Sequence, residues 1–179
     1  MERKVLFFLR RGDEPEVITT HIETSYEIMA QIPIYKDLLS DDLLVQEFNM
    51  GKNYYLKQDV QVIFDFIKVC LDSGFTEIVP PAQEYRANDP DIMKLFEIPQ
   101  QALDVLYVMS SNNKPDFKRW AILIQLADFF ELENVKEGVA QNIARACEQY
   151  KVEELQEMTG VNMNDIEKEE FKSKHPWLF

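Results

Sequence analysis

"KPDFKRWAILIQLADFFELENVKEGVAQNIARAC" (residues 114–147) is the most regular stretch of the chain, and it predicts two consecutive helices. The first half is strongly apolar and carries Pro115 near its start, where a helix tolerates proline. The second half opens with a capping box formed by Asn134 and Glu137. Its apolar residues then fall on one stripe: Val135, Val139, Ile143 and Cys147. We therefore expect a helical core in this part of the molecule.

The N-terminal part predicts a small β-sheet. The β-type run "KVLFFLR" (4–10) is followed by the turn residues "RGDEPE" (11–16) and by the β-branched run "VITTHIE" (17–23), an order typical of a hairpin. "VQEFNM" (45–50) predicts a further strand. A small sheet followed by a mainly helical remainder is an α+β organisation.

Helices are also expected between and after these strands. In "TSYE" (24–27) the Thr24 side chain is expected to cap a short helix. Pro33 is expected to interrupt that helix, and "YKDLLSDDLL" (35–44) to form a second helical piece. "QDVQVIFDFIKVCLD" (58–72) carries apolar residues at positions 60, 63, 67, 70 and 71, one face of an amphipathic helix.

Beyond that helix the pattern breaks down and then resumes. Residues 73–101 mix prolines, charges and isolated apolar side chains, and they predict a long irregular excursion. "ALDVLYVMSSN" (102–112) returns to a helical pattern.

The C-terminal segments predict two short helices with one apolar stripe each. "KVEELQEM" (151–158) is followed by "NDIEKEEFKSK" (164–174), in which Asn164 and Glu167 form another capping signature, and the chain finishes on "KHPWLF" (174–179). Neither helix has enough apolar area to form a core alone. They are expected to fold over another apolar surface, which is either the rest of this chain or a helix of a partner.

Composition excludes several classes of function. The chain of 179 residues is 46% hydrophobic with a formal net charge of -13, so we expect no binding to nucleic acid, which requires clustered Lys and Arg. Charges interrupt every apolar run, so no membrane association is expected. Cys70 and Cys147 each lie in an apolar helical pattern and are expected to be buried free thiols in a reducing compartment, the cytoplasm or the nucleus.

Sequence motifs of catalysis are missing. No phosphate-binding glycine loop and no nucleophile elbow occurs, and His21 and His175 lack Cys or Asp at ligand spacing. We therefore expect a protein that is not an enzyme and holds no metal or cofactor. An active site assembled from distant residues is the remaining enzymatic hypothesis.

The order of several phrases resembles the SKP family, the adaptor subunits of SCF-type (cullin–F-box) ubiquitin ligases. These phrases are "LADFFELENV" (126–135), "QNIARAC" (141–147) and "KVEELQEMTGV" (151–161), followed by an acidic helix and a tryptophan near the end of the chain. Upstream, "VIFDFIKVC" (62–70) and "IPQQALDVLYV" (98–108) are similar to segments of the same family. The region between residues 73 and 116 departs from the family pattern.

The resemblance implies a BTB/POZ-type domain over residues 1–147 and a C-terminal helical extension over residues 148–179. It also implies an F-box-type protein as a partner, a cullin as a possible second partner, and a possible homodimer formed through the BTB-like domain. Carried over by position, the F-box-type contact would use Val152, Leu155, Met158, Val161, Ile166, Phe171 and Trp177. The cullin-type contact would use Val105 and Tyr107.

Two functions follow from the resemblance. The first is a noncatalytic adaptor that links an F-box-type substrate receptor to a cullin scaffold. The second is an SKP-like structural assembly subunit that binds F-box-like partners or itself without a cullin, which the altered 73–116 region motivates.

Overall fold

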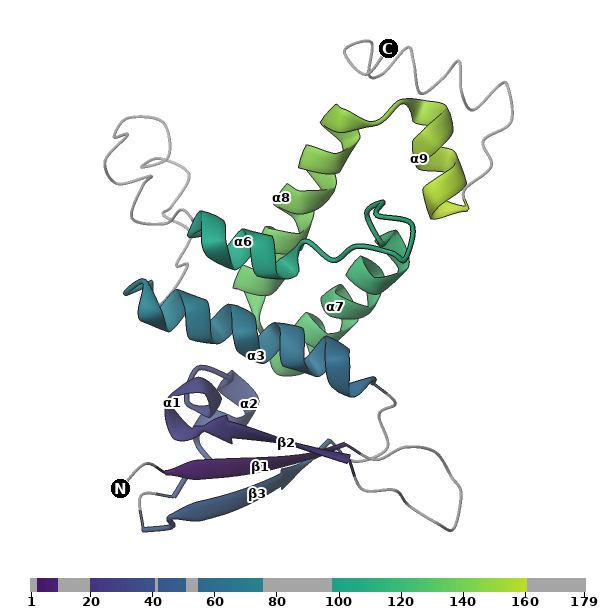
Figure 1. The fold of residues 1–179 in the computed structure, drawn as a ribbon. Helices are drawn as coiled ribbons and strands as arrows, with labels where there is room; N and C mark the ends of the chain where they lie inside the picture. Colours follow the sequence, from purple (N-terminus) through teal and green to yellow (C-terminus); the bar gives the residue numbers. More distant parts are fainter. Residues whose placement is uncertain (1–2, 10–19, 41, 51–54, 76–97, 161–179) are drawn as a thin grey trace, which may run out of the picture.

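The computed structural model describes residues 3–9, 20–40, 42–50, 55–75 and 98–160. Figure 1 shows a small sheet at one end of the molecule, short helices and one long helix beside it, and the remaining helices stacked beyond that long helix. The described residues form three strands and seven helices. The predicted α+β class is therefore confirmed at that level.

The sheet has β1 (Lys4–Leu9) at its centre. β2 (Thr20–Ser25) pairs with β1 in antiparallel orientation, and β3 (Val45–Asn49) pairs with it in parallel orientation on the other side. The strands of the predicted hairpin and the third strand are confirmed, while the hairpin turn lies outside the described residues. Successive side chains alternate between the two faces: Phe7 is fully buried beneath the helices, and its neighbour Phe8 is partly exposed on the opposite face.

The first helix, α1 (Tyr26–Met29), begins one residue later than expected. Its cap is Ser25, whose hydroxyl accepts a hydrogen bond from the Ile28 N–H at 3.3 Å. The prediction that Thr24 caps this helix is wrong, because the helix begins at Tyr26 and the N-cap position therefore falls on Ser25, while Thr24 pairs with Val5 in the sheet. Ser25 is the last residue of β2, and its extended backbone is the conformation that an N-cap takes.

The prediction of a helix over residues 35–44 is also wrong. The helix in this region, α2 (Pro33–Lys36), begins at its proline, which occupies the first turn, where no N–H is needed. After α2, the side chain of Gln46 on β3 replaces the helical hydrogen bonds. Its Nε2 donates to the Leu38 carbonyl at 2.6 Å, and its Oε1 accepts from the Ser40 N–H at 2.9 Å.

The long helix α3 (Lys57–Asp72) confirms the predicted amphipathic pattern and forms the centre of the core. In this core the Phe7 ring of β1 contacts three other aromatic rings. The ring centroids of Phe64 and Tyr35 each lie 5.5 Å from that of Phe7, and the Phe130 centroid lies at 6.0 Å. Such edge-on arrangements are favourable beyond simple burial. The side chains of α3 that the core covers are Asp59, Val60, Ile63, Phe64, Phe66, Ile67 and Cys70.

Three further helices complete the described core: α6 (Gln100–Leu106), α7 (Phe117–Phe130) and α8 (Glu133–Gln149). The two consecutive helices expected from residues 114–147 are thus confirmed. The expected capping box is wrong, because the cap of α8 is Leu132, which makes no side-chain cap hydrogen bond. α8 has already begun at Glu133, so Asn134 lies inside its first turn.

Close contact fastens α8 to α6. Gly138 lies so near α6 that a Cβ there would be 2.6 Å from Leu106 Cδ1, so only glycine fits without displacing a buried leucine. One turn further along, the buried Asn142 donates from Nδ2 to the Leu103 carbonyl at 2.8 Å. α8 therefore holds a fixed position over α6, and Ala146 in its last turn is still fully buried.

Both cysteines are free thiols, Cys70 buried and Cys147 partly buried. Burial raises the pKa of the Cys70 thiol from 9.0 to about 12. Burial likewise raises the pKa of the Tyr35 hydroxyl from 10.0 to about 12. In both cases the folded protein favours the neutral form, because the charged form would lose its hydration.

We therefore expect the protein to lose stability in alkali. A raised folded-state pKa contributes stability that is complete below the unfolded value and is lost as pH rises toward the folded value. For Cys70 this window runs from 9.0 to about 12, and the urea midpoint should fall across it. The variant Cys70→Ala should show a shallower fall, and equal falls in both proteins would contradict the assignment to Cys70.

Candidate partner-binding site

The last described helix, α9 (Val152–Thr159), carries the described part of the predicted F-box-type contact. α9 follows α8 after a short link. The predicted domain boundary between residues 147 and 148 falls within the last turn of α8. The division into two domains stays a prediction. At its start the Lys151 N–H donates to Glu154 Oε2 at 3.0 Å. At its end Gly160 adopts a left-handed conformation (φ 71°) that glycine takes readily. The expected helix is confirmed, with a defined start and end.

The apolar stripe of α9 is only partly covered. Val152, Leu155 and Met158 are each partly buried, and no residue of α9 is fully buried. Glu153 and Glu154 are exposed and lie in the first turn, where carboxylates interact favourably with the helix dipole. The sequence therefore places the apolar residues on one side of a helix that the described part of the molecule does not bury completely.

Beside α9 lies a surface groove with a volume of about 330 Å³. Met158 and Glu157 of α9 line one side, and the start of α7 with Phe117 lines the other. Lys114 pairs with Glu157 across it at 3.7 Å, and since their side chains are 40% and 77% exposed this pair adds little stability. The full lining is Ser110, Asn112, Lys114, Pro115, Asp116, Phe117, Lys118, Glu157 and Met158.

The turn that lines this groove is held in shape by its own hydrogen bonds. The Ser110 N–H donates to the Lys114 carbonyl at 2.8 Å, and the Ser110 hydroxyl donates to the same oxygen at 3.0 Å. Asp116 then caps α7 by accepting from the Arg119 N–H at 3.1 Å. The position of Phe117 is therefore defined by hydrogen bonds within the chain.

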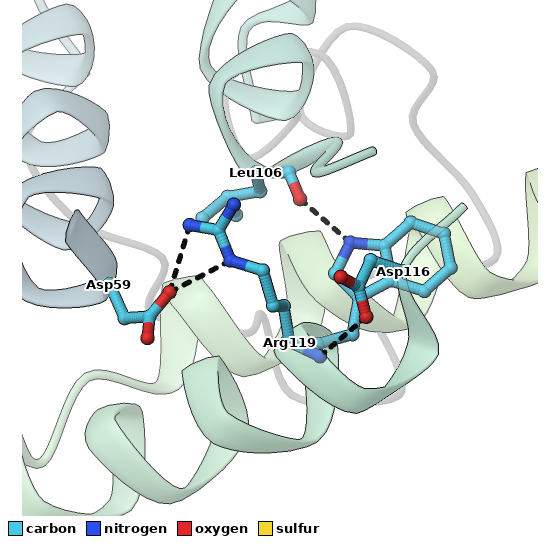
Figure 2. A network of polar contacts seen from close by, with 5 residues as sticks. Asp59, Leu106, Asp116 and Arg119 are labelled. Atoms are coloured by element: carbon cyan, nitrogen blue, oxygen red, sulfur yellow. Dashed lines mark hydrogen bonds and ion pairs between the residues drawn. The ribbon is translucent and has the colours of Figure 1, made fainter. Parts of the chain in front are cut away.

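Figure 2 shows how the start of α7 is tied to the core. Arg119 donates from Nε to Oδ1 of Asp59 on α3 at 2.9 Å, and its terminal nitrogen lies 2.8 Å from the same oxygen. The next residue, Trp120, is fully buried and donates from Nε1 to the Leu106 carbonyl at 2.8 Å. α7 is thus attached to α3 and to α6 within a single turn.

The predicted cullin-type residues lie at the end of α6. Val105 is partly buried against the core. The ring of Tyr107 meets the edge of Trp120 at 5.6 Å, and the Arg145 guanidinium lies 5.6 Å from the Tyr107 ring centre. Burial and the neighbouring Tyr150 raise the pKa of the Tyr107 hydroxyl, while Arg145 acts in the opposite direction.

Contacts between aromatic side chains connect the groove beside α9 with Tyr107, one of the predicted cullin-type residues. Phe117, which lines the groove, meets Trp120 at 5.0 Å, and Trp120 meets Tyr107. Tyr107 and the groove beside α9 are therefore joined through one buried tryptophan. The structure brings together Val152, Leu155 and Met158 on one helix, and Tyr107 is not among the residues that line the groove.

Other predicted site residues cannot be placed. Val161, Ile166, Phe171 and Trp177 lie outside the described residues. Phe117 is a site residue that sequence reasoning missed. The sequence carries only part of the signal: Asp116 as a cap predicts that a helix begins at Phe117, and that pattern does not indicate which other element Phe117 lies beside.

A second hollow of about 350 Å³ lies elsewhere, between the end of α1 and α2, the second half of α3 and the start of α8. Its apolar floor includes Phe66, Ile67 and Cys70. Lys36 and Glu133 are among the charged residues that line it. It contains none of the predicted site residues.

Comparisons do not assign the chain to a family: no protein-family model matches the sequence, and no curated protein matches it. In the part of the chain that the structure describes, no helix combines the length and apolar composition that a membrane crossing needs. Among the same residues, no group of three or more His, Cys, Asp or Glu side chains is arranged to hold a metal ion.

Proposed function

We propose that this protein is a noncatalytic adaptor that joins an F-box-type substrate receptor to a cullin in a ubiquitin ligase complex. One observation carries the proposal: α9 holds Val152, Leu155 and Met158 on a single partly uncovered stripe beside a preformed groove. The order of sequence phrases that resembles the SKP family supplies the class of partner. Val161, Ile166, Phe171 and Trp177 belong to the proposed contact on the resemblance alone.

The proposed fold is a BTB/POZ-type domain with a C-terminal helical extension. A small sheet with one parallel and one antiparallel neighbour for its central strand, followed by packed helices, supports this assignment. In this scheme α9 is the first helix of the extension. Its position against the start of α7 would let the extension and α7 contact one partner together.

Binding in this scheme follows the helix-in-groove mode, in which an apolar helix face covers an apolar stripe. Complete burial of an exposed side chain of this size is worth roughly 1.5–3 kcal/mol, and covering the part of Val152, Leu155 or Met158 that is still exposed would contribute a fraction of that. The adaptor itself needs no chemistry, because holding a receptor and a cullin on one rigid body raises the effective concentration of substrate near the ligating enzyme.

A specific observation favours the second function, an SKP-like assembly subunit that works without a cullin. The Tyr107 ring is already in contact with Trp120 and Arg145 of the same chain. A partner that needed this ring would have to displace Arg145 or bind a largely covered surface. Loss of cullin binding with retained F-box binding would select this alternative.

Replacing Leu155 with aspartate is expected to weaken capture of an F-box-type protein by about tenfold or more, since it places a charge on the stripe that the partner would cover. The full-length chain, the Leu155→Asp variant and a chain truncated after Tyr150 should be compared in pull-downs from native extract. Glu153→Gln is the matched control, since Glu153 is exposed and does not belong to the stripe. Thermal unfolding of Leu155→Asp is measured alongside, because Leu155 is partly buried and a loss of packing on α9 must be distinguished from a loss of binding.

The outcomes separate the functions. An F-box-type protein and a cullin captured together by the full-length chain, with only the cullin retained after truncation, support the ligase adaptor. F-box-type proteins without a cullin support the assembly subunit. Neither partner with any version of the chain contradicts both, and the stripe of α9 is then covered by this chain alone.

A further inference from the structure

The edge of the sheet that β3 forms is unpaired in the part of the chain that the structure describes. β3 is the last strand in the order β2-β1-β3, and its only neighbour there is β1. The Lys4 N–H donates to the Leu44 carbonyl at 3.1 Å, and the Met50 N–H donates to the Phe8 carbonyl at 3.1 Å. Backbone groups alternate in direction along a strand, so those of Val45 and Glu47 face away from β1, toward the free edge.

Apolar side chains collect at this edge. Among the described residues, four of the six exposed large hydrophobic side chains precede or begin β3: Leu38 at 60%, Leu43 at 49%, Leu44 at 57% and Val45 at 53% exposure. A row of unsatisfied backbone groups flanked by exposed apolar side chains is a template for another strand, and proteins normally blunt such edges. β3 contains no proline and no lysine that would do so.

The charges at the edge are all of one sign. Asp37, Asp42 and Glu47 are exposed, and residues 37–50 contain no Lys, Arg or His. In the register of the sheet, the basic residue closest to β3 is Lys4, which lies opposite Val45. The Lys4 side chain is already paired with Glu23 of β2. The edge therefore presents carboxylates beside its apolar side chains, and the nearest bases along the sequence are Lys36 and Lys52.

We propose that β3 binds an extended, basic and apolar segment of another protein, which adds to the sheet as a strand beside Val45–Asn49. Main-chain hydrogen bonds to Val45 and Glu47 would supply register and affinity. Apolar residues of the partner would cover the exposed leucines, and its Lys or Arg residues would pair with Asp42 and Glu47. This mode is strand addition to a sheet edge, and it uses a surface separate from α9.

A second copy of the chain fits the edge less well. The formal net charge of -13 makes two copies repel one another, and like charges facing each other across strands are destabilising. Charge complementarity therefore favours a basic partner over self-association.

The test uses the full-length chain and a labelled, capped peptide of about six residues, the usual length of a strand, that alternates Val and Lys. Binding is measured by fluorescence anisotropy, and amide exchange of the protein is followed with and without the peptide. We expect binding that weakens with salt and slows exchange at Val45 and Glu47. Two altered peptides should each bind at least about tenfold more weakly. In the first, N-methylation removes the backbone N–H groups that would face β3. In the second, Glu replaces each Lys.

Variants at one position separate the backbone from the charge. Glu47→Pro removes the carboxylate together with an N–H that faces the free edge, where proline is tolerated, and it should weaken binding at least about tenfold. Glu47→Ala keeps that N–H and should lose only part of the salt dependence. If Glu47→Pro fails to fold, the N-methylated peptide on the natural chain makes the same distinction. No binding of the Val–Lys peptide, equal binding of the N-methylated peptide, or a dimer of the free chain that protects Val45 and Glu47 would each overturn the proposal.

Discussion

Replacing Arg119 with methionine is expected to lower the free energy of unfolding by about 3 kcal/mol, the lower end of the range for breaking a buried ion pair. Asp59 is completely buried, and its Oδ1 accepts both of the Arg119 interactions. Its other oxygen already has no hydrogen-bond partner among the described residues. Without Arg119 the carboxylate would remain in the core with no positive charge. The Arg119 side chain is 25% exposed, so water can partly replace it, which sets the lower end of the range. Urea unfolding of the natural chain and the variant measures the difference.

A double variant tests whether the cost comes from the stranded carboxylate. Asp59→Leu combined with Arg119→Met removes both charges, and it should recover most of the lost stability, because an apolar pair of similar volume often replaces a buried ion pair at little cost. Lys118→Met is the matched control on the neighbouring, exposed position and should change stability by less than about 0.5 kcal/mol. A single variant as stable as the natural chain would show that Asp59 and Arg119 do not depend on each other.

This ion pair also marks the limit of inference from the sequence. Asp59 and Arg119 are 60 residues apart, and nothing in either local pattern indicates the other. Helices α3, α7 and α9 follow from the spacing of their own apolar residues, which is a local signal. The parallel pairing of β3 with β1 joins strands that are separated by β2 and two helices, and local periodicity does not specify which strands become neighbours.

The incorrect expectation for residues 35–44 has a similar cause. Leu38, Leu43 and Leu44 can be placed on a helix by spacing alone, but the structure leaves them exposed. The side chain of Gln46 supplies hydrogen bonds to the backbone that precedes it, and this interaction depends on β3 having formed. Tertiary contacts thus override a weak local preference.

The candidate site also contains residues that local spacing predicts and residues that it does not predict. The stripe of Val152, Leu155 and Met158 was predictable because one short helix contains it. Its counterpart across the groove, Phe117, was not predicted, because the contact depends on how α8 returns the chain to the start of α7. A spacing rule finds a helix face, while a groove requires knowledge of which elements meet.

Replacing Phe7 with alanine is expected to lower the free energy of unfolding by about 3–5 kcal/mol, the cost of removing a large buried aromatic side chain. Phe7 has no exposed surface, and its ring meets those of Tyr35, Phe64 and Phe130. It therefore joins the sheet, α2, α3 and α7, and its loss would open a cavity where all four meet. Both the urea midpoint and the melting temperature should fall.

The neighbouring residue provides the control for that prediction. Phe8 lies on the outer face of β1, is partly exposed and meets the His21 ring at 5.7 Å. Phe8→Ala removes a side chain of the same size from the same strand, yet it should cost less than about 3 kcal/mol, because Phe8 is already partly exposed and does not belong to the core cluster. The difference between the two variants measures how strongly the helices cover one face of the sheet. Equal losses would mean that the outer face is also covered in solution, and the exposed surface beside β3 would then be smaller than the structure indicates.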